Sequence, residues 1–533
     1  MNRRASESKT ERSEVHAPSH PLLNRSPRTT AFASLGLIVG AAALVLGLGL
    51  SRQPSDPPLD LSASIGVLDE GIWSHNAAND ALYGRPRLDD FNPMVVTAGS
   101  WLYRASYALA GVGILQTRLP SIVLGTAAVL LVGLLLWRED RLAGILAAWL
   151  LASCYLFLAY SRLGLLETPA IAAALGGLAC VVATLRRERP LVAAIGGVLV
   201  AAACTTKIQV IAPIGGAALA LSAWYLLSGR RQLRVGRSLL FAAAGFTLVS
   251  VTWTVYVVTR LDTAARAEWA WHSSGVSPRV QEIPGTVWGF VRASDGFGTR
   301  ARPLLIAAAV GLILQTVAWT SRRWRPGPIH VAALGWAVGG FLLVAPLPYH
   351  PSRYSVLVLP GLAMVAAGGI QALRSSLRGR VRTVAAAVAL IGIATSALLG
   401  VREWARWSPT YDLRRTAGVL AQATGPGDVI IGGWALLPSL DAHRRVVIIR
   451  VPGINDRCPI ERFGATWILM EHTHGDRVFY DRFAPGLLTG EDPVATASVL
   501  GHPLDLFRIP AGTPDTCDPR TAPPASDPGD ARG

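Results

Sequence analysis

The chain has 533 residues, of which 51% are hydrophobic and only 16% are charged, and its mean hydropathy is +0.38. Soluble globular domains carry about 25% charged residues, so this composition excludes an ordinary soluble protein and indicates a membrane protein. The formal net charge is +16. Because many of the arginines stand in short loops between apolar runs, this charge points to membrane orientation and not to nucleic-acid binding.

Apolar runs near the roughly 20 residues that cross a bilayer recur through the first 400 positions. The first run has no convincing small-residue cleavage site after it, so we expect a retained helix and not a signal peptide. The pattern predicts eleven membrane-spanning helices, at residues 31 to 50, 118 to 137, 142 to 160, 168 to 185, 190 to 206, 208 to 227, 238 to 259, 303 to 320, 329 to 346, 354 to 373 and 383 to 400.

The short basic loops decide the orientation. If the basic tail, residues 1 to 30, is cytoplasmic, then every short arginine-rich loop falls on the same side, as the positive-inside rule requires. We therefore predict a multi-pass α-helical membrane protein with its N-terminus inside and its C-terminal segment outside. Its preference for arginine over lysine and its abundant alanine favour a GC-rich bacterial source, and hence the cytoplasmic (inner) membrane of a bacterium.

The segment after the last apolar run changes character. Residues 401 to 510 combine a helix-like stretch, Tyr411 to Thr424, with short β-type runs in "DVIIGG", "RRVVIIRV", "ATWILMEH" and "ATASVL", which predict a small extracytoplasmic α/β domain. Residues 511 to 533 are rich in proline and aspartate and predict a disordered tail. Cys458 and Cys517 lie on the oxidising side, which permits a disulfide, although two unpaired thiols fit the sequence equally well.

Candidate catalytic residues stand in the first outer loop, residues 51 to 117, which is far longer than a connection between two helices needs. Within "LDEGIWSHNAANDALYG", Asp69 and Glu70 are adjacent acids about twenty residues after the first apolar run. His75 is a candidate substrate-binding residue, and so are Arg162 and His350 further along the chain. Trp73 and His75 equally suit a helix that lies on the membrane surface.

Further charges stand where the outer ends of other apolar runs meet. "YSRLGLLETPA" carries Arg162 and Glu167, and "CTTKIQVIAP" carries Lys207. Because the chain contains only one other lysine, Lys9, a lysine between two apolar helices is informative. An ammonium at this depth needs a partner or a function and suits a phosphate group, while the alternative is that it reaches the membrane surface along its apolar stem.

The last short outer turn, "APLPYHPSRYSVLVLP", carries His350 and Arg353. A guanidinium at the mouth of a span can bind a phosphate through paired hydrogen bonds, or it can anchor the helix at the interface together with neighbouring tyrosines. Acids and cations thus converge on the outer face, and the chain has no phosphate-binding loop, dinucleotide-binding loop or Cys/His metal spacing. This pattern indicates a lipid-phosphate substrate that arrives from the bilayer and a polar acceptor that arrives from water.

These stretches, with "QTRLPSIVLG" and "SRYSVLVLPGLAM", resemble in order and sidedness the GT-C glycosyltransferases of family 39, which include the protein O-mannosyltransferases and the lipid A aminoarabinose transferases. The resemblance covers roughly residues 31 to 400. It implies a GT-C transmembrane catalytic domain there, and an inverting transfer of a sugar from a polyprenyl-phosphate donor to an acceptor hydroxyl. By position it implies Asp69 as the catalytic base, Glu70 as its neighbour, Glu167 as a second acid, and Lys207 and Arg353 as the residues that bind the donor phosphate.

Several alternatives stay open at this stage. A non-enzymatic transporter or flippase for lipid-linked sugars would use the same cations but would not need Asp69, and it would more often place polar residues at mid-membrane. The acids could also hold a divalent metal ion. The sequence identifies neither the sugar nor the acceptor, which could be a protein, a glycan or a lipid, and it leaves the oligomeric state open.

Overall fold

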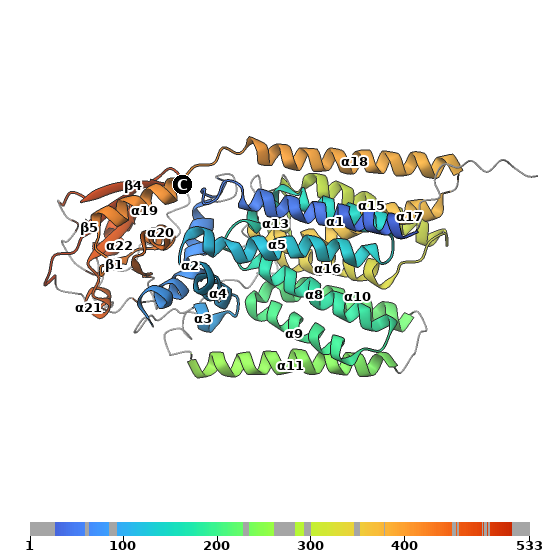
Figure 1. Cartoon of the computed structure of the whole chain (residues 1–533), viewed down its shortest axis with the longest axis horizontal. Helices are drawn as coiled ribbons and strands as arrows, with labels where there is room; N and C mark the ends of the chain where they lie inside the picture. The colour runs from blue at the N-terminus through green and yellow to red at the C-terminus, as the bar shows by residue number, and fades with distance from the viewer. Residues whose placement is uncertain are drawn as a thin grey trace, which may run out of the picture.

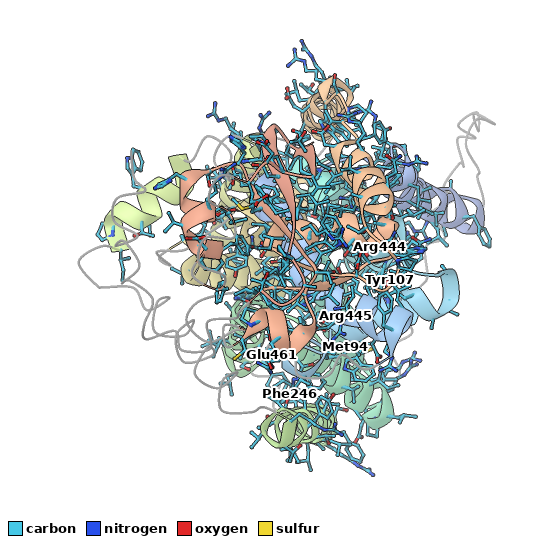
Figure 2. All side chains as sticks on the ribbon, turned by 90° about the vertical axis from the view of Figure 1, so that its left-hand side faces the viewer. Met94, Tyr107, Phe246, Arg444, Arg445 and Glu461 are labelled. Carbon is cyan, nitrogen blue, oxygen red and sulfur yellow. The ribbon has the colours of Figure 1, made fainter. Side chains whose placement is uncertain are left out.

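The computed structural model describes residues 27–58, 63–84, 93–227, 234–260, 283–292, 300–345, 352–377, 379–449, 455, 458–481, 483, 488 and 491–513. Long helices lie roughly along one axis, and a small mixed sheet lies beyond one end of the bundle (Figure 1). Figure 2 shows the molecule from the sheet side. α11, which carries the labelled Phe246, lies at the bottom of this view, and α18 lies at the top. The fold is therefore a helical polytopic membrane fold, as the apolar runs predict.

Every predicted span overlaps a helix or a pair of helices. The bundle helices are α1 (Pro27–Leu50), α5 (Ile114–Trp137), α6 (Arg141–Ala152), α7 (Tyr155–Ser161), α8 (Glu167–Arg186), α9 (Pro190–Thr206), α10 (Ile211–Leu227), α11 (Arg234–Arg260), α15 (Arg302–Thr320), α16 (Pro328–Val344), α17 (Leu359–Ser376) and α18 (Gly379–Arg406). A shorter helix, α13 (Ile283–Arg292), precedes α15. Among the described residues, six helices are long and apolar enough to cross a membrane, and the bent pair α6 and α7 can form a seventh span.

The predicted span at 142 to 160 is divided in the structure. Helices α6 and α7 meet at an angle of 65° around Ser153 and Cys154. The Ser153 hydroxyl donates to the carbonyl of Trp149 at 2.7 Å, and such side-chain bonds compete with the regular helix. α18 also approaches here, because a Cβ on Gly400 would lie 1.7 Å from the Ser153 carbonyl oxygen.

Close packing of the bundle depends on small residues. A Cβ on Gly216 of α10 would lie 2.1 Å from the carbonyl oxygen of Gly335 in α16, and one on Gly335 would lie 2.3 Å from the Gly216 carbonyl oxygen. The two backbones therefore touch, which is the way membrane helices associate when lipid removes the hydrophobic driving force between them. Large apolar side chains of α11 and α15 stay exposed, as expected for surfaces in contact with lipid.

The loop at residues 51 to 117, which the sequence predicts to be the first outer loop, is largely helical where it is described. It contains α2 (Ala63–Tyr83), α3 (Pro93–Val96) and α4 (Ser100–Ala110). Figure 1 shows these helices between the bundle and the sheet. The two 3₁₀ turns η2 (Ile208–Val210) and η4 (Ser352–Leu357) precede α10 and α17. The predicted spans at 208 to 227 and 354 to 373 therefore begin in 3₁₀ turns and continue as α-helices.

The C-terminal region contains a five-stranded sheet with the order β2-β1-β3-β5-β4. Its strands are β1 (Val429–Ile431), β2 (Arg445–Val447), β3 (Trp467–Glu471), β4 (Ala495–Val499) and β5 (His502–Arg508), and its helical elements are α19 (Asp412–Ala423), η5 (Gly433–Ala435), α20 (Pro438–Ala442), α21 (Pro459–Phe463) and α22 (His474–Asp481). β1 pairs in parallel with β2 and β3, and β5 pairs antiparallel with β3 and β4. Four strands fall in the predicted runs, whereas β5 is an addition.

The first outer loop and the sheet share one hydrophobic core. Ala77 of α2 and Tyr103 of α4 belong to the same buried cluster as Ile430 of β1 and Leu469 of β3. The opposite face of the sheet packs on a separate cluster that contains Phe463 of α21 and Tyr480 of α22. Because β1 is buried on both faces, its three residues are all apolar. The C-terminal region is thus packed against the helix that carries Asp69 and Glu70.

Candidate active site

Helix α2 separates the two adjacent acids of the first outer loop. It is a regular helix of 21 residues, and successive residues of an α-helix point about 100° apart. Asp69 contacts Arg353 of η4, whereas Glu70 contacts Arg118 of α5. The adjacent carboxylates therefore belong to two different clusters.

Four of the residues proposed from the sequence meet at one end of the bundle. Lys207 Nζ lies 3.1 Å from Glu167 Oε1, and Arg353 Nε lies 3.4 Å from the same oxygen. Arg353 Nη1 also forms an ion pair with Asp69 Oδ2. We call Asp69, Glu167, Lys207 and Arg353 the four-charge cluster; with two acids and two bases, its formal charges cancel.

Each bundle member of the four-charge cluster stands at a break in a helix. Glu167 is the first residue of α8, where unpaired backbone N–H groups favour a carboxylate. Lys207 follows α9 in an extended conformation, with φ −150° and ψ 106°, before η2 begins. Arg353 lies in η4, just before α17. Three charges of the cluster thus lie where helices of the bundle begin or end.

Two aromatic rings frame the cations of this cluster. Lys207 Nζ lies 5.2 Å from the centroid of the Trp73 ring and 5.3 Å from that of Tyr354. The Arg353 Cζ atom also lies 5.3 Å from the Tyr354 ring. Gln209 Nε2 donates to the Tyr354 hydroxyl at 3.2 Å. The rings attract the cations and displace water from them, which strengthens their interaction with any nearby anion.

Asp69 is the most exposed member of the four-charge cluster. Its side chain is 15% exposed, compared with 8% for Arg353, 7% for Lys207 and 1% for Glu167. Burial raises the pKa of the Asp69 carboxyl above its ordinary value, although Arg353 and Lys207 act in the opposite direction. Asp69 therefore takes up a proton more readily than an exposed aspartate does, a property that general bases share.

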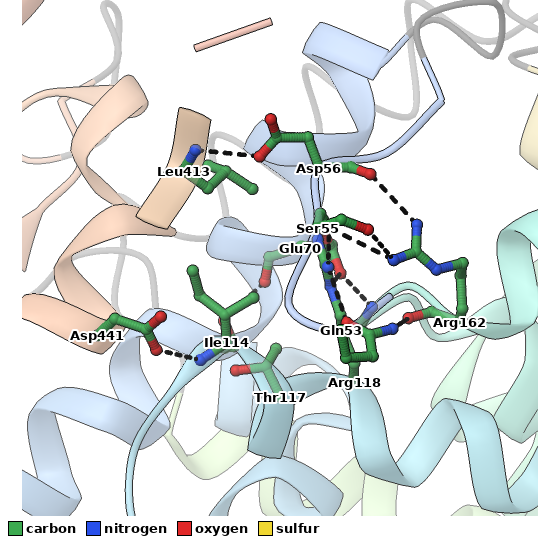
Figure 3. Close-up of polar contacts among 12 residues, drawn as sticks. Gln53, Ser55, Asp56, Glu70, Ile114, Thr117, Arg118, Arg162, Leu413 and Asp441 are labelled. Carbon is green, nitrogen blue, oxygen red and sulfur yellow. Dashed lines mark hydrogen bonds and ion pairs between the residues drawn. The ribbon is translucent and has the colours of Figure 1, made fainter. Parts of the chain in front are cut away.

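Glu70 lies in a second, fully buried cluster (Figure 3). Arg118 donates to its two carboxylate oxygens from Nε at 2.9 Å and from Nη2 at 2.8 Å, and the Gly164 N–H donates to Oε1 as well. Neither Glu70 nor Arg118 has any exposed side-chain surface. Glu70 was proposed as a catalytic neighbour of Asp69, but the structure places it away from the four-charge cluster, where it joins α2 to α5 and to the turn before α8.

Arg162 belongs to the same buried cluster. Its Nη2 donates to the Ser55 hydroxyl at 2.7 Å and its Nη1 donates to the Asp56 carbonyl at 3.2 Å. Its guanidinium also stacks on Trp407, with Cζ 4.4 Å from the ring centroid. Arg118 donates to the Ser55 carbonyl at 2.5 Å. We call Glu70, Arg118, Arg162, Ser55 and Asp56 the buried arginine network.

The two histidines proposed from the sequence have different outcomes. His75 is 1% exposed, and its Nδ1 lies 3.0 Å from the Ile72 carbonyl and 3.2 Å from the Gly71 carbonyl. These contacts hold the ring against its own helix. His350 lies outside the described residues. Cys517 also lies outside the described residues. The sequence left a disulfide and two unpaired thiols open, and Cys458 is disulfide-bonded in the structure.

Sequence reasoning did not single out Arg118, Trp73 or Tyr354 as site residues. Arg118 begins an apolar run, and a buried cation there needs a partner; this was the available signal, and the partner is Glu70. The aromatic residues gave no signal, because their position beside Lys207 follows only from the packing of α2 and η4. Among the described residues, no group of three or more His, Cys, Asp or Glu side chains is arranged to hold a metal ion.

Comparison with known proteins gives a consistent picture of the fold. Residues 93–256 match the family of dolichyl-phosphate-mannose-protein mannosyltransferases. This segment includes Glu167 and Lys207 but neither Asp69 nor Arg353. No curated protein matches the chain in sequence.

Solved structures extend the likeness over most of the chain. ArnT from Cupriavidus metallidurans, solved bound to undecaprenyl phosphate, is similar with a TM-score of 0.59 and 15% sequence identity, over 91% of this chain and 99% of that one. The archaeal oligosaccharyltransferase AglB from Archaeoglobus fulgidus, solved with an inhibitory peptide and a dolichol-phosphate, is similar with a TM-score of 0.53 and 12% identity, over 83% of this chain and 70% of that one. The chain therefore shares the fold of these two proteins, which agrees with the GT-C fold that the sequence resemblance implies.

Proposed function

We propose that this chain, a GT-C-fold relative of the mannosyltransferases, is a membrane glycosyltransferase that moves a sugar from a polyprenyl-phosphate donor to an acceptor hydroxyl with inversion. The observation that carries the proposal is the four-charge cluster at one end of the bundle. It puts two cations, which suit a phosphate, beside a partly exposed carboxylate that suits a base. The lipid phosphates named with the solved ArnT and AglB structures support the same class of donor.

Lys207 and Arg353 are proposed to bind the donor phosphate. The leaving phosphate gains negative charge as the bond from the sugar's anomeric carbon to the phosphate oxygen breaks. Fixed cations in a site with little water stabilise that charge most in the transition state. Trp73 and Tyr354 favour this role, because they keep the cations in place and shield them from water. The phosphate then leaves with the electron pair of the broken bond.

Asp69 is proposed to act as the general base. It removes the proton of the acceptor hydroxyl while that oxygen forms a new bond to the anomeric carbon, on the face opposite the phosphate. Asp69 suits the role because it is the most exposed member of the four-charge cluster. Glu167 is almost fully buried between the two cations, so its proposed role is to position them.

Donor binding must rearrange the ion pairs of the free chain. Arg353 contacts Asp69 and Glu167, and Lys207 contacts Glu167. A donor phosphate adds negative charge to a cluster that is already balanced, so it competes with a carboxylate for each cation. We expect the phosphate to replace Asp69 at Arg353, since Asp69 is the partner nearer to solvent. The base is then free to meet the acceptor.

The roles predicted from the sequence for Glu70, Arg162 and His75 are replaced by proposals that fit their contacts. Glu70 and Arg162 are proposed to be positioning residues of the buried arginine network, and His75 to support α2. The proposed domains are a cytoplasmic tail at 1 to 30, a catalytic domain at 31 to 400, an extracytoplasmic region at 401 to 510 and a tail at 511 to 533. The proposed location is the inner membrane of a bacterium, with the N-terminus inside and the four-charge cluster at the outer face.

The alternative function is a non-enzymatic transporter or flippase for lipid-linked sugars, but no observation favours it. Glu167 and Lys207 of the four-charge cluster lie at helix ends, whereas transporters usually place ionisable residues near the bilayer midplane between broken helices. A carrier would also have no need of Asp69.

The decisive experiment compares the purified wild-type protein with an Asp69→Asn variant. Each is incubated with a panel of radiolabelled polyprenyl-phosphate sugars and a bacterial envelope extract, and the label released from lipid is counted. We expect the variant to transfer on the order of 10³-fold more slowly, because a general base contributes roughly 10²- to 10⁴-fold, and still to bind undecaprenyl phosphate.

Asp80→Asn provides a matched control on the same helix, because Asp80 pairs with Arg104 at 3.0 Å, outside the four-charge cluster. It should transfer at nearly the wild-type rate. Equal rates in the wild-type and Asp69→Asn proteins would contradict the assignment of the base. Translocation of labelled lipid without any transfer would establish the carrier instead.

A further inference from the structure

The far half of α2 is bound to the edge of the C-terminal sheet. Asn79 Nδ2 donates to the Val446 carbonyl at 2.8 Å, and the Val446 N–H donates to Asn79 Oδ1 at 3.3 Å. Val446 lies in β2, the last strand at that side of the sheet. An edge strand leaves backbone N–H and C=O groups unpaired, and a side-chain amide can satisfy one of each. Asn79 thus takes the place of a neighbouring strand.

The near half of α2 also touches the C-terminal region. A Cβ on Gly71 would lie 2.4 Å from Leu436 Cβ, so the helix backbone packs directly on the segment between η5 and α20. Gly71 is only two residues from Asp69. At the end of the helix, the Tyr83 hydroxyl donates to the His443 carbonyl. The contacts to the C-terminal region therefore extend along most of the described helix.

The opposite side of α2 is bound to the bundle. Glu70 holds Arg118 of α5 and the Gly164 N–H with both carboxylate oxygens. The helix is thus bound on two sides, to the bundle through Glu70 and to the sheet through Asn79. Asn79 is 2% exposed, so no water competes for its bonds. A helix held at two separated points has a fixed axial position and rotation, and both set where the Asp69 carboxylate lies.

We propose that Asn79 is a positioning residue for the transfer reaction, and that the C-terminal sheet is part of the catalytic machinery because it holds α2 in register with Arg353 and Lys207. This inference rests on the proposed function, in which Asp69 is the base. A shift of about 1 Å in a catalytic group can lower the rate about 10²-fold. Loss of the Asn79 bonds should therefore affect turnover more than donor binding, since both proposed phosphate-binding cations lie on the bundle.

The test compares Asn79→Leu with Asn455→Leu. Asn455 is a matched control because it is buried and donates from Nδ2 to the Ile448 carbonyl at 2.8 Å, just beyond β2. Both variants lose an amide bond to the same part of the sheet. Active sites are counted by binding of undecaprenyl phosphate, so that a loss of folded protein is separated from a loss of rate per site.

We expect Asn79→Leu to lower the transfer rate per binding site about 10- to 100-fold, with the KM for the donor changed less than about twofold. Asn455→Leu should keep its rate per site within about twofold of wild type. An equal fall in both variants would overturn the positioning role and leave Asn79 with a purely structural one. If Asn79→Leu does not fold, Asn79→Asp keeps the acceptor for the Val446 N–H, loses the donor, and should show a smaller fall in the same direction.

A second readout does not depend on activity. Hydrogen exchange of the backbone amides around Asp69 should become faster in Asn79→Leu and stay unchanged in Asn455→Leu. If exchange behaves in this way but neither the wild type nor any variant transfers sugar, then Asn79 does hold α2 in place and the proposed function is wrong. If transfer is present but exchange around Asp69 is equally slow in both variants, the inference itself is overturned.

Discussion

The four-charge cluster and the buried arginine network share helix α2 but differ in how their charges are satisfied. In the four-charge cluster, Asp69 is partly exposed and forms an ion pair with Arg353. In the buried arginine network, Glu70 accepts three bonds and is fully enclosed. A ligand can replace a partner in the first cluster without unfolding anything, whereas any loss in the second leaves a charge buried without a partner. Two adjacent acids can therefore have separate roles, with Asp69 available to a ligand site and Glu70 stabilising the fold.

The largest effect should come from breaking the buried arginine network. Replacing Arg118 with leucine leaves Glu70 buried without its cation, and removal of one partner of a buried pair costs about 3–5 kcal/mol. We expect a loss of folding stability of that size, measured as a lower midpoint of thermal unfolding in detergent.

A double variant, Arg118→Leu with Glu70→Leu, sharpens this comparison. Because it removes both charges, it should recover much of the stability lost in the single variant. A single variant that is as stable as the wild type would show that Glu70 and Arg118 are not coupled as the structure indicates.

The next effect concerns the cations of the four-charge cluster. Lys207→Ala should weaken binding of undecaprenyl phosphate about 10- to 100-fold, since a hydrogen bond to a charged group contributes about 1.5–3 kcal/mol. Folding stability should change far less than in Arg118→Leu, because Glu167 keeps Arg353 as a partner. Equilibrium binding of the radiolabelled lipid measures the difference, and unchanged affinity would remove Lys207 from the phosphate site.

The smallest effect concerns pH. Because burial raises the pKa of Asp69, lowering the pH protonates this carboxyl earlier than an exposed aspartate. The neutral acid no longer competes for Arg353, so binding of undecaprenyl phosphate should tighten by a few-fold as the pH falls, while transfer declines because the base is lost.

Asp69→Asn is the control for this pH dependence. Its affinity for undecaprenyl phosphate should already be high at neutral pH and should not rise further in acid through this group. If wild-type binding and turnover instead fall together with decreasing pH, Asp69 and the phosphate do not compete for Arg353.

Much of the site could be anticipated because charged residues in a membrane protein are few. Each of Glu167, Lys207 and Arg353 interrupts or borders an apolar run, and a charge in such a place needs a partner or a function. The same argument applies to Arg118, which was quoted within a motif but not proposed as a site residue. What the pattern could not provide was the pairing, since these residues come from separate segments of the chain between positions 118 and 353.

The separation of Asp69 from Glu70 also required the structure. Within a loop of unknown conformation, the directions of two adjacent acidic side chains cannot be predicted. Once α2 is helical, their side chains diverge by about 100°, and packing then brings Arg353 to one and Arg118 to the other. Similarly, the break between α6 and α7 lies where α18 approaches at Gly400, a contact that no local pattern records.

The sequence by itself determined the membrane class, the positions of the apolar helices and the short list of charged residues at their ends. It could do so because long apolar helices satisfy their own backbone hydrogen bonds in hydrocarbon, where charges are costly and therefore few. Only the tertiary structure decided which charges pair, that Asn79 completes the edge of the sheet, and that the C-terminal region packs against the helix of the proposed base. These features depend on contacts between distant segments, such as Asn79 with Val446, which no local pattern records.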